Sequence, residues 1–132
     1  MSTETTASVS THILDTSVGR PAEGVAVRLF ARSGRDADWR MLGASATDAD
    51  GRCKDLPASP EGTTHVRLDF AVEAYFDKKQ ADAQQDAPAN RDSGAPGAFF
   101  PEVAITFAVV PGEHYHVPLL LNPFGYCVYR GS

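Results

Sequence analysis

Cysteine is scarce in this sequence. Cys53 and Cys127 are the only two in 132 residues, and they lie too far apart to form a Cys-x-x-Cys pair. Two cysteines cannot build the disulfide framework of a small secreted domain, and they lack the spacing of a zinc or redox motif. We therefore expect two reduced thiols in a reducing compartment.

Basic residues are also few. Lysine and arginine number 12 against 17 aspartates and glutamates, which gives a net charge of −5. Domains that bind nucleic acid or anionic lipid carry the opposite balance. We expect neither a nucleic-acid partner nor a membrane partner, and an anionic ligand would have to be bound by a local basic cluster.

Long apolar runs and targeting signals are absent as well. No run approaches the ~20 apolar residues that cross a bilayer. The polar start, MSTETTASVSTHILD, has neither the cationic nor the apolar part of a secretory signal, and the final RGS is not a peroxisomal address. These features favour a cytoplasmic protein.

The sequence does contain a series of short segments with strand-like alternation. In residues 25–32, small and branched apolar side chains alternate with Arg28, Phe30 and Arg32, which is the period of a strand with one buried face. Similar segments occupy residues 10–17, 39–47, 65–72, 103–110, 114–121 and 124–130. Residues 73–83 are rich in helix formers. We predict a single domain over residues 1–132, an all-β antiparallel β-sandwich with one short helix.

Two segments look irregular, and one edge looks unprotected. Residues 1–8 read as a flexible leader, and residues 84–98, rich in proline, glycine, asparagine and serine, read as a surface loop. The C-terminal strand, residues 124–130, contains no lysine, glutamate or proline, the residues that discourage edge-to-edge pairing. We therefore expect self-association through sheet edges.

Two histidines, two positions apart, are the first candidates for chemistry. His114 and His116 would point to the same face of a strand. They could begin a zinc site, with His12 of the first predicted strand as a third ligand, or supply a general base. From the residues alone both possibilities stay open, as does a structural role for His12.

Other features are less specific on their own. Arg52 follows the turn sequence DADG, where its planar guanidinium could bind an anionic or carbonyl-rich ligand. Its neighbour Cys53 could be a thiolate of lowered pKa. The terminal YRGS is harder to explain, because a packed edge strand accounts for Tyr129 but not for the three residues after it.

In combination, four motifs resemble the 5-hydroxyisourate hydrolases, the transthyretin-related enzymes of urate breakdown. The motifs are THILDTSVGRPAEGV, TDADGRC, HYHVPLLL and the terminal YRGS, in that order. The resemblance implies a transthyretin-like sandwich of two four-stranded sheets with one short helix. It also implies a homotetramer built by edge-strand pairing, with active sites in the channel between dimers, and no cofactor.

The resemblance further implies a set of site residues and no metal. The catalytic residues would be His12, Arg52, His116 and Ser132. The substrate-binding residues would be His12, Arg52, Tyr129, Arg130 and Gly131.

The implied reaction is hydrolysis of the cyclic N1–C6 amide of 5-hydroxyisourate. His116 would act as general base on water, while Arg52 would bind ring carbonyls and stabilise negative charge. His12 would position the ring or assist proton transfer to the leaving nitrogen, with activated water favoured over Ser132 as the nucleophile. The alternatives are a non-enzymatic transthyretin-like carrier of a small ligand and a zinc hydrolase that uses the histidines.

Overall fold

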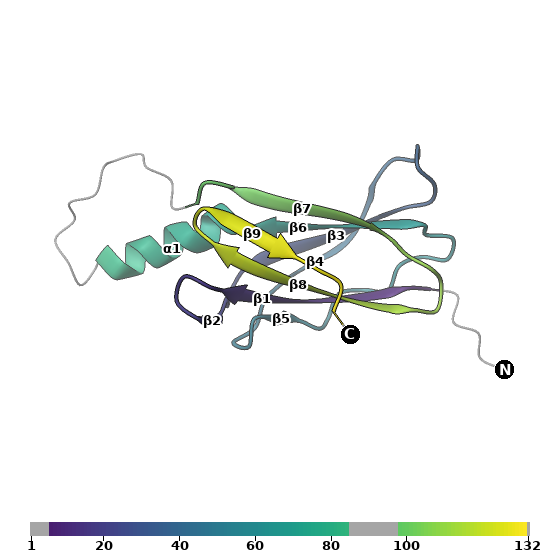
Figure 1. Ribbon diagram of the computed structural model, residues 1–132. Helices are drawn as coiled ribbons and strands as arrows, with labels where there is room; N and C mark the ends of the chain where they lie inside the picture. Colours follow the sequence, from purple (N-terminus) through teal and green to yellow (C-terminus); the bar gives the residue numbers. More distant parts are fainter. Residues whose placement is uncertain (1–5, 85–97, 132) are drawn as a thin grey trace.

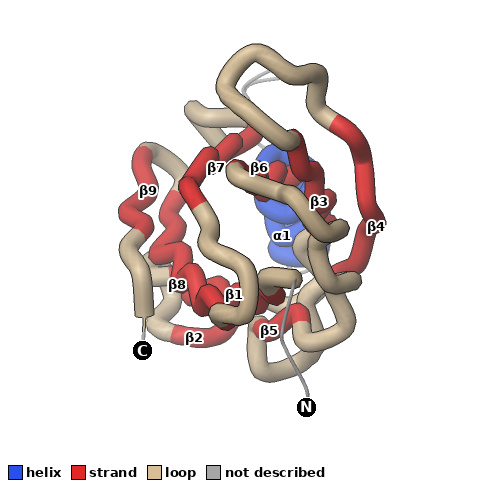
Figure 2. Tube along the Cα trace, turned by 90° about the vertical axis from the view of Figure 1, so that its right-hand side faces the viewer, coloured by secondary structure: helices blue, strands red, loops and turns tan. Residues whose placement is uncertain are grey.

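Two β-sheets pack face to face, and helix α1 (Val72–Gln84) lies at one end of them (Figure 1). The structure is a computed structural model that describes residues 6–84 and 98–131. Seen along the strands in Figure 2, β9, β8 and β1 form one layer, and β7, β6, β3 and β4 form the other. The predicted two-layer, mostly β architecture is confirmed.

The first sheet has the strand order β2-β1-β8-β9, and β5 also pairs with β1. Its strands are β1 (Ser8–Asp15), β2 (Arg20–Pro21), β5 (Arg52–Cys53), β8 (His114–Asn122) and β9 (Gly125–Val128). The second sheet has the order β4-β3-β6-β7. Its strands are β3 (Ala26–Arg32), β4 (Arg40–Ala46), β6 (His65–Ala71) and β7 (Glu102–Ala108).

Two details of the predicted sandwich are corrected by this topology. The pairing of β1 with β8 is parallel, although the other pairs are antiparallel. The first sheet also has five strands, because the two-residue strands β2 and β5 share one side of β1. Alternation in a sequence shows which side chains share a face, but it carries no information on strand direction or neighbours.

Inward-facing side chains of both sheets form the core. Ile13 of β1 and Leu119 of β8 meet Leu29 of β3 and Leu68 of β6, and all four are fully buried. In β3 the buried residues alternate with Arg28, Phe30 and Arg32, as predicted. Burial of these apolar side chains, at roughly 1.5–3 kcal/mol each, fixes the register and hence the outer face that carries the site.

The C-terminal strand ends earlier than its sequence pattern predicts. We expected a strand through residue 130, whereas β9 ends at Val128. The N–H of Tyr129 donates to the carbonyl of Pro118, but proline has no N–H to return the bond. The regular ladder therefore stops opposite Pro118, and the following residues continue as a tail across β8.

The predicted irregular segments need smaller corrections. The leader is shorter than eight residues, because Ala7 is buried and Ser8 begins β1. Ala98, placed at the end of the predicted loop, is also buried, because a small apolar side chain in a polar segment can still pack on the core. Gln84, the first residue of the predicted loop, ends the helix instead. The rest of the predicted loop, residues 85–97, lies outside the described residues. The helix, α1 (Val72–Gln84), agrees with its prediction.

A buried carboxylate joins the helix to the first sheet. The Asp15 carboxylate has no exposed surface, and it accepts hydrogen bonds from the Tyr75 hydroxyl at 2.8 Å and the Lys79 ammonium at 2.9 Å. Ser17 donates to the same carboxylate from its backbone N–H at 3.0 Å and from its hydroxyl. Within the described residues no helix is long and apolar enough to cross a bilayer.

Candidate active site

The outer face of the first sheet brings three of the predicted site residues together. His12 on β1 pairs with Arg52 on β5 at one side and with Pro118 on β8 at the other. Two residues earlier on both strands, Ser10 pairs with His116. Paired residues in a sheet project to the same face, so the side chains of His12, Arg52 and His116 share the outer surface.

The two imidazoles lie at the centre of this face. The ring centroids of His12 and His116 are 6.5 Å apart, and the ring planes are tilted by 31°. Both residues are partly buried. This separation is too large for a direct hydrogen bond between the rings, and it leaves both rings able to contact one small polar molecule lying on the sheet.

Arg52 is held opposite His12 by the DADG turn. The Asp48 carboxylate accepts the backbone N–H groups of Asp50 at 2.9 Å and Arg52 at 3.0 Å. Gly51 has φ +77°, and a Cβ there would lie 2.4 Å from the carbonyl oxygen of Ile13. The turn thus needs glycine both for its backbone conformation and for its close approach to β1, and it delivers the arginine to the site.

The C-terminal tail closes over His116 from the other side. The N–H of Gly131 donates to the carbonyl of His116 at 2.8 Å. A Cβ at Gly131 would lie 2.9 Å from the His116 ring and 3.1 Å from the Pro118 ring. Only glycine therefore fits at this contact. Tyr129 lies opposite Pro118, which in turn pairs with His12, and its side chain is half exposed. Ser132 lies outside the described residues.

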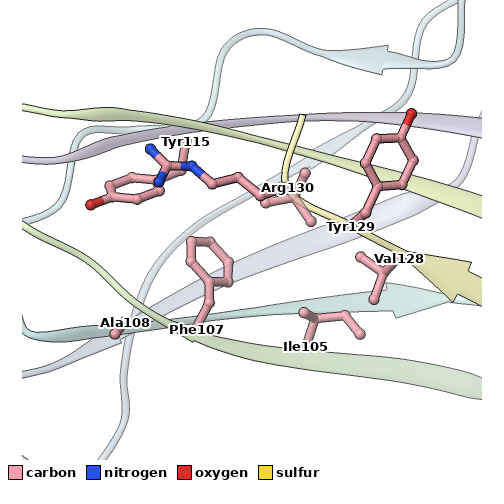
Figure 3. Close-up of a pocket in the computed structure, with 8 residues that line it drawn as sticks. Ile105, Phe107, Ala108, Tyr115, Val128, Tyr129 and Arg130 are labelled. Carbon is pink, nitrogen blue, oxygen red and sulfur yellow. The ribbon is translucent and has the colours of Figure 1, made fainter. Parts of the chain in front are cut away.

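Arg130 is not brought together with the other site residues. Its neighbours Tyr129 and Gly131 belong to the outer face, so alternation sends Arg130 to the opposite side. Its guanidinium lies 4.5 Å from the centre of the Tyr115 ring and 3.3 Å from the Glu113 carboxylate. Figure 3 shows it over Tyr115. Arg130 lines a largely apolar pocket of about 260 Å³ together with residues of β7, β8 and β9, on the face of β8 opposite to His116.

Electrostatics favour the neutral form of His116. Partial burial lowers the pKa of the His116 imidazole, because the charged form loses hydration. The Arg52 guanidinium lowers that pKa further by charge repulsion, and the His12 and His114 imidazoles act in the same direction. A neutral imidazole can accept a proton, as a general base must.

A hydroxyl lies between two of the histidines and was not predicted from the sequence. The Ser10 hydroxyl lies 2.9 Å from His114 Nε2 and 2.9 Å from His116 Nδ1. Ser8 reaches the remaining nitrogen of His114, with 2.6 Å between Oγ and Nδ1. Strand alternation places Ser8, Ser10 and His12 on one face, which was a usable signal, but only the parallel pairing of β1 with β8 shows which residues they meet.

Metal and thiol chemistry find little support in the described chain. Among its residues no group of three or more histidine, cysteine and carboxylate side chains is arranged to hold a metal ion, so the three histidines of the zinc alternative do not form a ready site. The suggested thiolate at Cys53 is wrong, because burial raises the pKa of this buried thiol.

Comparison with known proteins identifies the family. The sequence model of the HIUase/Transthyretin family matches residues 9–131. The chain belongs to this family. It is 39% identical over 126 residues to the 5-hydroxyisourate hydrolase of Salmonella dublin, a match that covers 94% of this chain and 80% of that one.

Solved structures of the HIUase/Transthyretin family agree with the fold. The 5-hydroxyisourate hydrolase of Klebsiella pneumoniae superposes with a TM-score of 0.69 at 32% identity, covering 96% of this chain and 94% of that one. Transthyretin from Sparus aurata gives a TM-score of 0.72 at 26% identity, covering 93% and 95%. The transthyretin-like fold predicted from the sequence is therefore confirmed. Because the family contains both hydrolases and transthyretins, the residues of the site are needed to distinguish an enzyme from a small-ligand carrier.

Proposed function

We propose that this protein is a 5-hydroxyisourate hydrolase of urate degradation. It would cleave the cyclic N1–C6 amide to give 2-oxo-4-hydroxy-4-carboxy-5-ureidoimidazoline. The observation that carries this assignment is the convergence of His12, Arg52 and His116 on one sheet face. The 39% identity to a hydrolase over nearly the whole chain supports it.

His116 is assigned as the general base. Its Nδ1 is occupied by the Ser10 hydroxyl, so Nε2 is the nitrogen that would take a proton from water. The water oxygen would attack the C6 carbonyl as that proton leaves. The lowered pKa of His116 keeps the base neutral near physiological pH.

Arg52 and His12 would act on the ring itself. The Arg52 guanidinium, exposed beside His12, is suited to bind carbonyl oxygens and to stabilise the oxyanion that forms at C6. His12 would hold the ring and deliver a proton to N1 as the C–N bond breaks. Both groups come from the paired strands β1 and β5, which hold them side by side on the sheet face.

The terminal residues have unequal support. Gly131 and Tyr129 would line the site beside His116 and His12, respectively. Arg130 could reach substrate only if its side chain left Tyr115 and Glu113. Ser132, the residue after Gly131 in the sequence, would orient the water or His116, and activated water remains the favoured nucleophile.

The remaining parts of the proposal concern assembly and location. The free edges of β9 and β7 would pair between copies to form a homotetramer. The proposed compartment is the cytoplasm, because both cysteines are free thiols. No cofactor and no metal are part of the proposed reaction.

The proposal is tested by generating 5-hydroxyisourate from urate with urate oxidase and following its ultraviolet absorbance with and without this protein. We expect decay faster than the spontaneous rate, unchanged by a chelator. A chelator-sensitive rate would indicate the zinc alternative. No acceleration by folded protein, together with tight binding of a small aromatic ligand, would indicate a transthyretin-like carrier.

A further inference from the structure

Two serines of β1 and two histidines of β8 form a continuous hydrogen-bonded chain on the outer sheet face. It runs from Ser8 to His114, from His114 to Ser10, and from Ser10 to His116, with contacts of 2.6, 2.9 and 2.9 Å. His116 is partly buried, whereas His114 is exposed. The chain therefore connects the assigned base to a second imidazole in contact with solvent.

Donor and acceptor counting allows two orientations of this chain. The Ser10 hydroxyl has one hydrogen, so it must donate to one imidazole and accept from the other. If it donates to His114 Nε2, it accepts from the Nδ1–H of His116, and His116 Nε2 keeps a free lone pair. If it donates to His116 instead, the proton of His116 sits on Nε2. Only the first orientation makes His116 a base toward the site.

We propose that Ser10 and His114 form a proton relay for His116. Ser10 fixes the Nδ1–H tautomer of the base, and His114 receives the proton and passes it to solvent. This inference rests on the proposed function, because it assumes that His116 is the base of the hydrolysis. Ser10 and His114 act through His116, so they are positioning residues.

The relay gives the proton that the reaction releases a path to solvent. Hydrolysis converts a cyclic amide and water into a carboxylic acid and a ureido nitrogen, which is too weakly basic to keep an extra proton. At neutral pH the acid ionises, so one proton leaves per turnover. His116 gains a proton from water at Nε2 and gives its Nδ1 proton to the Ser10 oxygen, while Ser10 gives its own proton to His114 Nε2. Solvent then takes one proton from His114, and the proton lost by the acid recharges His12, which protonated N1. After product leaves, exchange of the His116 ring protons with solvent restores the Nδ1–H form.

The charges around His116 favour this direction of transfer. Arg52 on β5 and His12 on β1 both face His116, and each of them disfavours a positive charge on this partly buried ring. The exposed His114 is further along the sheet, with its Nδ1 bonded to Ser8. Because His114 is exposed, water can remove a proton that reaches its ring.

The tautomer is measured without any substrate. Long-range ¹H–¹⁵N spectra of histidine side chains distinguish Nδ1–H from Nε2–H imidazoles. We expect His116 in the Nδ1–H form in the native protein and in Ser10→Thr, which keeps the hydroxyl. We expect a shift toward Nε2–H in Ser10→Ala. An Nε2–H His116 in the native protein, or no change in Ser10→Ala, would overturn the tautomer assignment.

The relay itself is measured kinetically in weak buffer. We expect His114→Ala to lower kcat about tenfold with KM unchanged, the rate equivalent of one hydrogen bond, and added imidazole to restore it. Ser10→Ala should show the same loss without rescue. His65→Ala, a control on β6 whose ring bonds only Thr64 among the described side chains, should retain the native rate.

The outcomes separate the relay from the proposed function. Native protein that fails to hydrolyse 5-hydroxyisourate refutes the function, while the tautomer spectra still test the chain of hydrogen bonds. If the native enzyme is active, two results refute the relay alone. The His114→Ala variant keeps the native kcat, or added imidazole fails to restore the kcat that the variant has lost. Uncatalysed decay in each imidazole buffer is subtracted, and unfolding in urea verifies that each variant is folded.

Discussion

His116 combines partial burial with a guanidinium and two further imidazoles nearby, and each of these favours its neutral form. A base is inactive once protonated, so activity falls as the pH drops through its pKa. Because the pKa of His116 is lowered, the acid side of the rate profile should lie below the pH at which an ordinary histidine titrates.

The charge of Arg52 is expected to set the position of that acid limb. Arg52→Gln removes the positive charge, so the pKa of His116 should rise and the acid limb of kcat/KM should move to higher pH. Arg52→Lys keeps the charge but loses the planar fork. Both variants should lose roughly 100-fold in rate through weaker oxyanion stabilisation. An acid limb that moves equally in both variants would contradict the charge effect.

Gly131 is expected to be essential for geometry rather than for stability. A methyl group there would lie 2.9 Å from the His116 ring and 3.1 Å from Pro118, so the tail must move away from the base. We expect Gly131→Ala to lose at least tenfold in kcat, while the free energy of unfolding changes by less than about 1 kcal/mol.

Gly125 provides the matched control for this glycine. It begins β9, the strand that leads into the tail, and a methyl group there would meet its nearest neighbour only at 4.0 Å. Gly125→Ala should therefore keep its activity in the same assay. Equal activity of the two variants would show that the tail does not need close contact with His116.

At the scale of elements, Asp15 is the principal polar link between β1 and α1. Burial alone would raise the pKa of its carboxyl, but the hydrogen bonds it accepts outweigh that effect, and its pKa lies below the usual range. The ionised form is thus stabilised by folding. The stability gained is present above the unfolded pKa of about 3.9 and is lost as the pH falls through the folded value.

Replacing this carboxylate should loosen the helix and flatten the pH dependence of stability. We expect Asp15→Asn to lower the free energy of unfolding by about 1–3 kcal/mol at neutral pH, because buried bonds to Tyr75 and Lys79 are weakened. In urea titrations, the difference from the native protein should shrink toward acid pH. A difference that stays constant down to the acid range would contradict the proposed ionisation.

Asp69 serves as the comparison carboxylate for this experiment. It pairs with Arg67 at 2.9 Å on the outer face of the second sheet, where both side chains are partly exposed. Asp69→Asn should cost less than Asp15→Asn because its partner can turn to solvent. A larger loss of unfolding free energy in Asp69→Asn than in Asp15→Asn would show that the polar contacts anchoring α1 are not the main polar contribution to stability.

At the scale of the whole molecule, local patterns and long-range pairings were not equally predictable. Alternation placed Ile13 and Asp15 on one face of β1 and His12 on the other, and the structure agrees. It could not show that β1 lies parallel to β8, because Ser10 and His116 are 106 residues apart. The hydroxyl between the histidines was missed for this reason.

Side-chain direction after the ladder ends was equally hard to read. The tail continues the alternation of β9, and this sends Arg130 toward Tyr115 while Gly131 approaches His116. From the sequence, all four residues of the terminal YRGS were predicted to belong to one site. Arg130 separates from Tyr129 and Gly131 because adjacent residues of an extended chain face opposite sides.

The free edge of β9 supports the proposed tetramer and yields the last prediction. The N–H groups of Tyr129 and Gly131 point to β8, so alternation leaves the N–H of Val128 pointing away from the sheet, toward a partner. Val128→Pro removes that donor without removing a bond to β8. We expect a smaller assembly by sedimentation velocity, whereas Val128→Thr, which keeps the N–H, should assemble normally.

A second edge variant guards against a folding defect at this half-buried position. Tyr126→Lys adds a charge to the same edge at a side chain that is 43% exposed, and lysine at an edge opposes strand pairing. Both variants should dissociate together and lose hydrolysis together if the site needs a neighbouring copy. Folded variants that keep the native mass would refute pairing at β9. Dissociated variants with full activity would instead show that one chain supplies the whole site, including His12, Arg52 and His116.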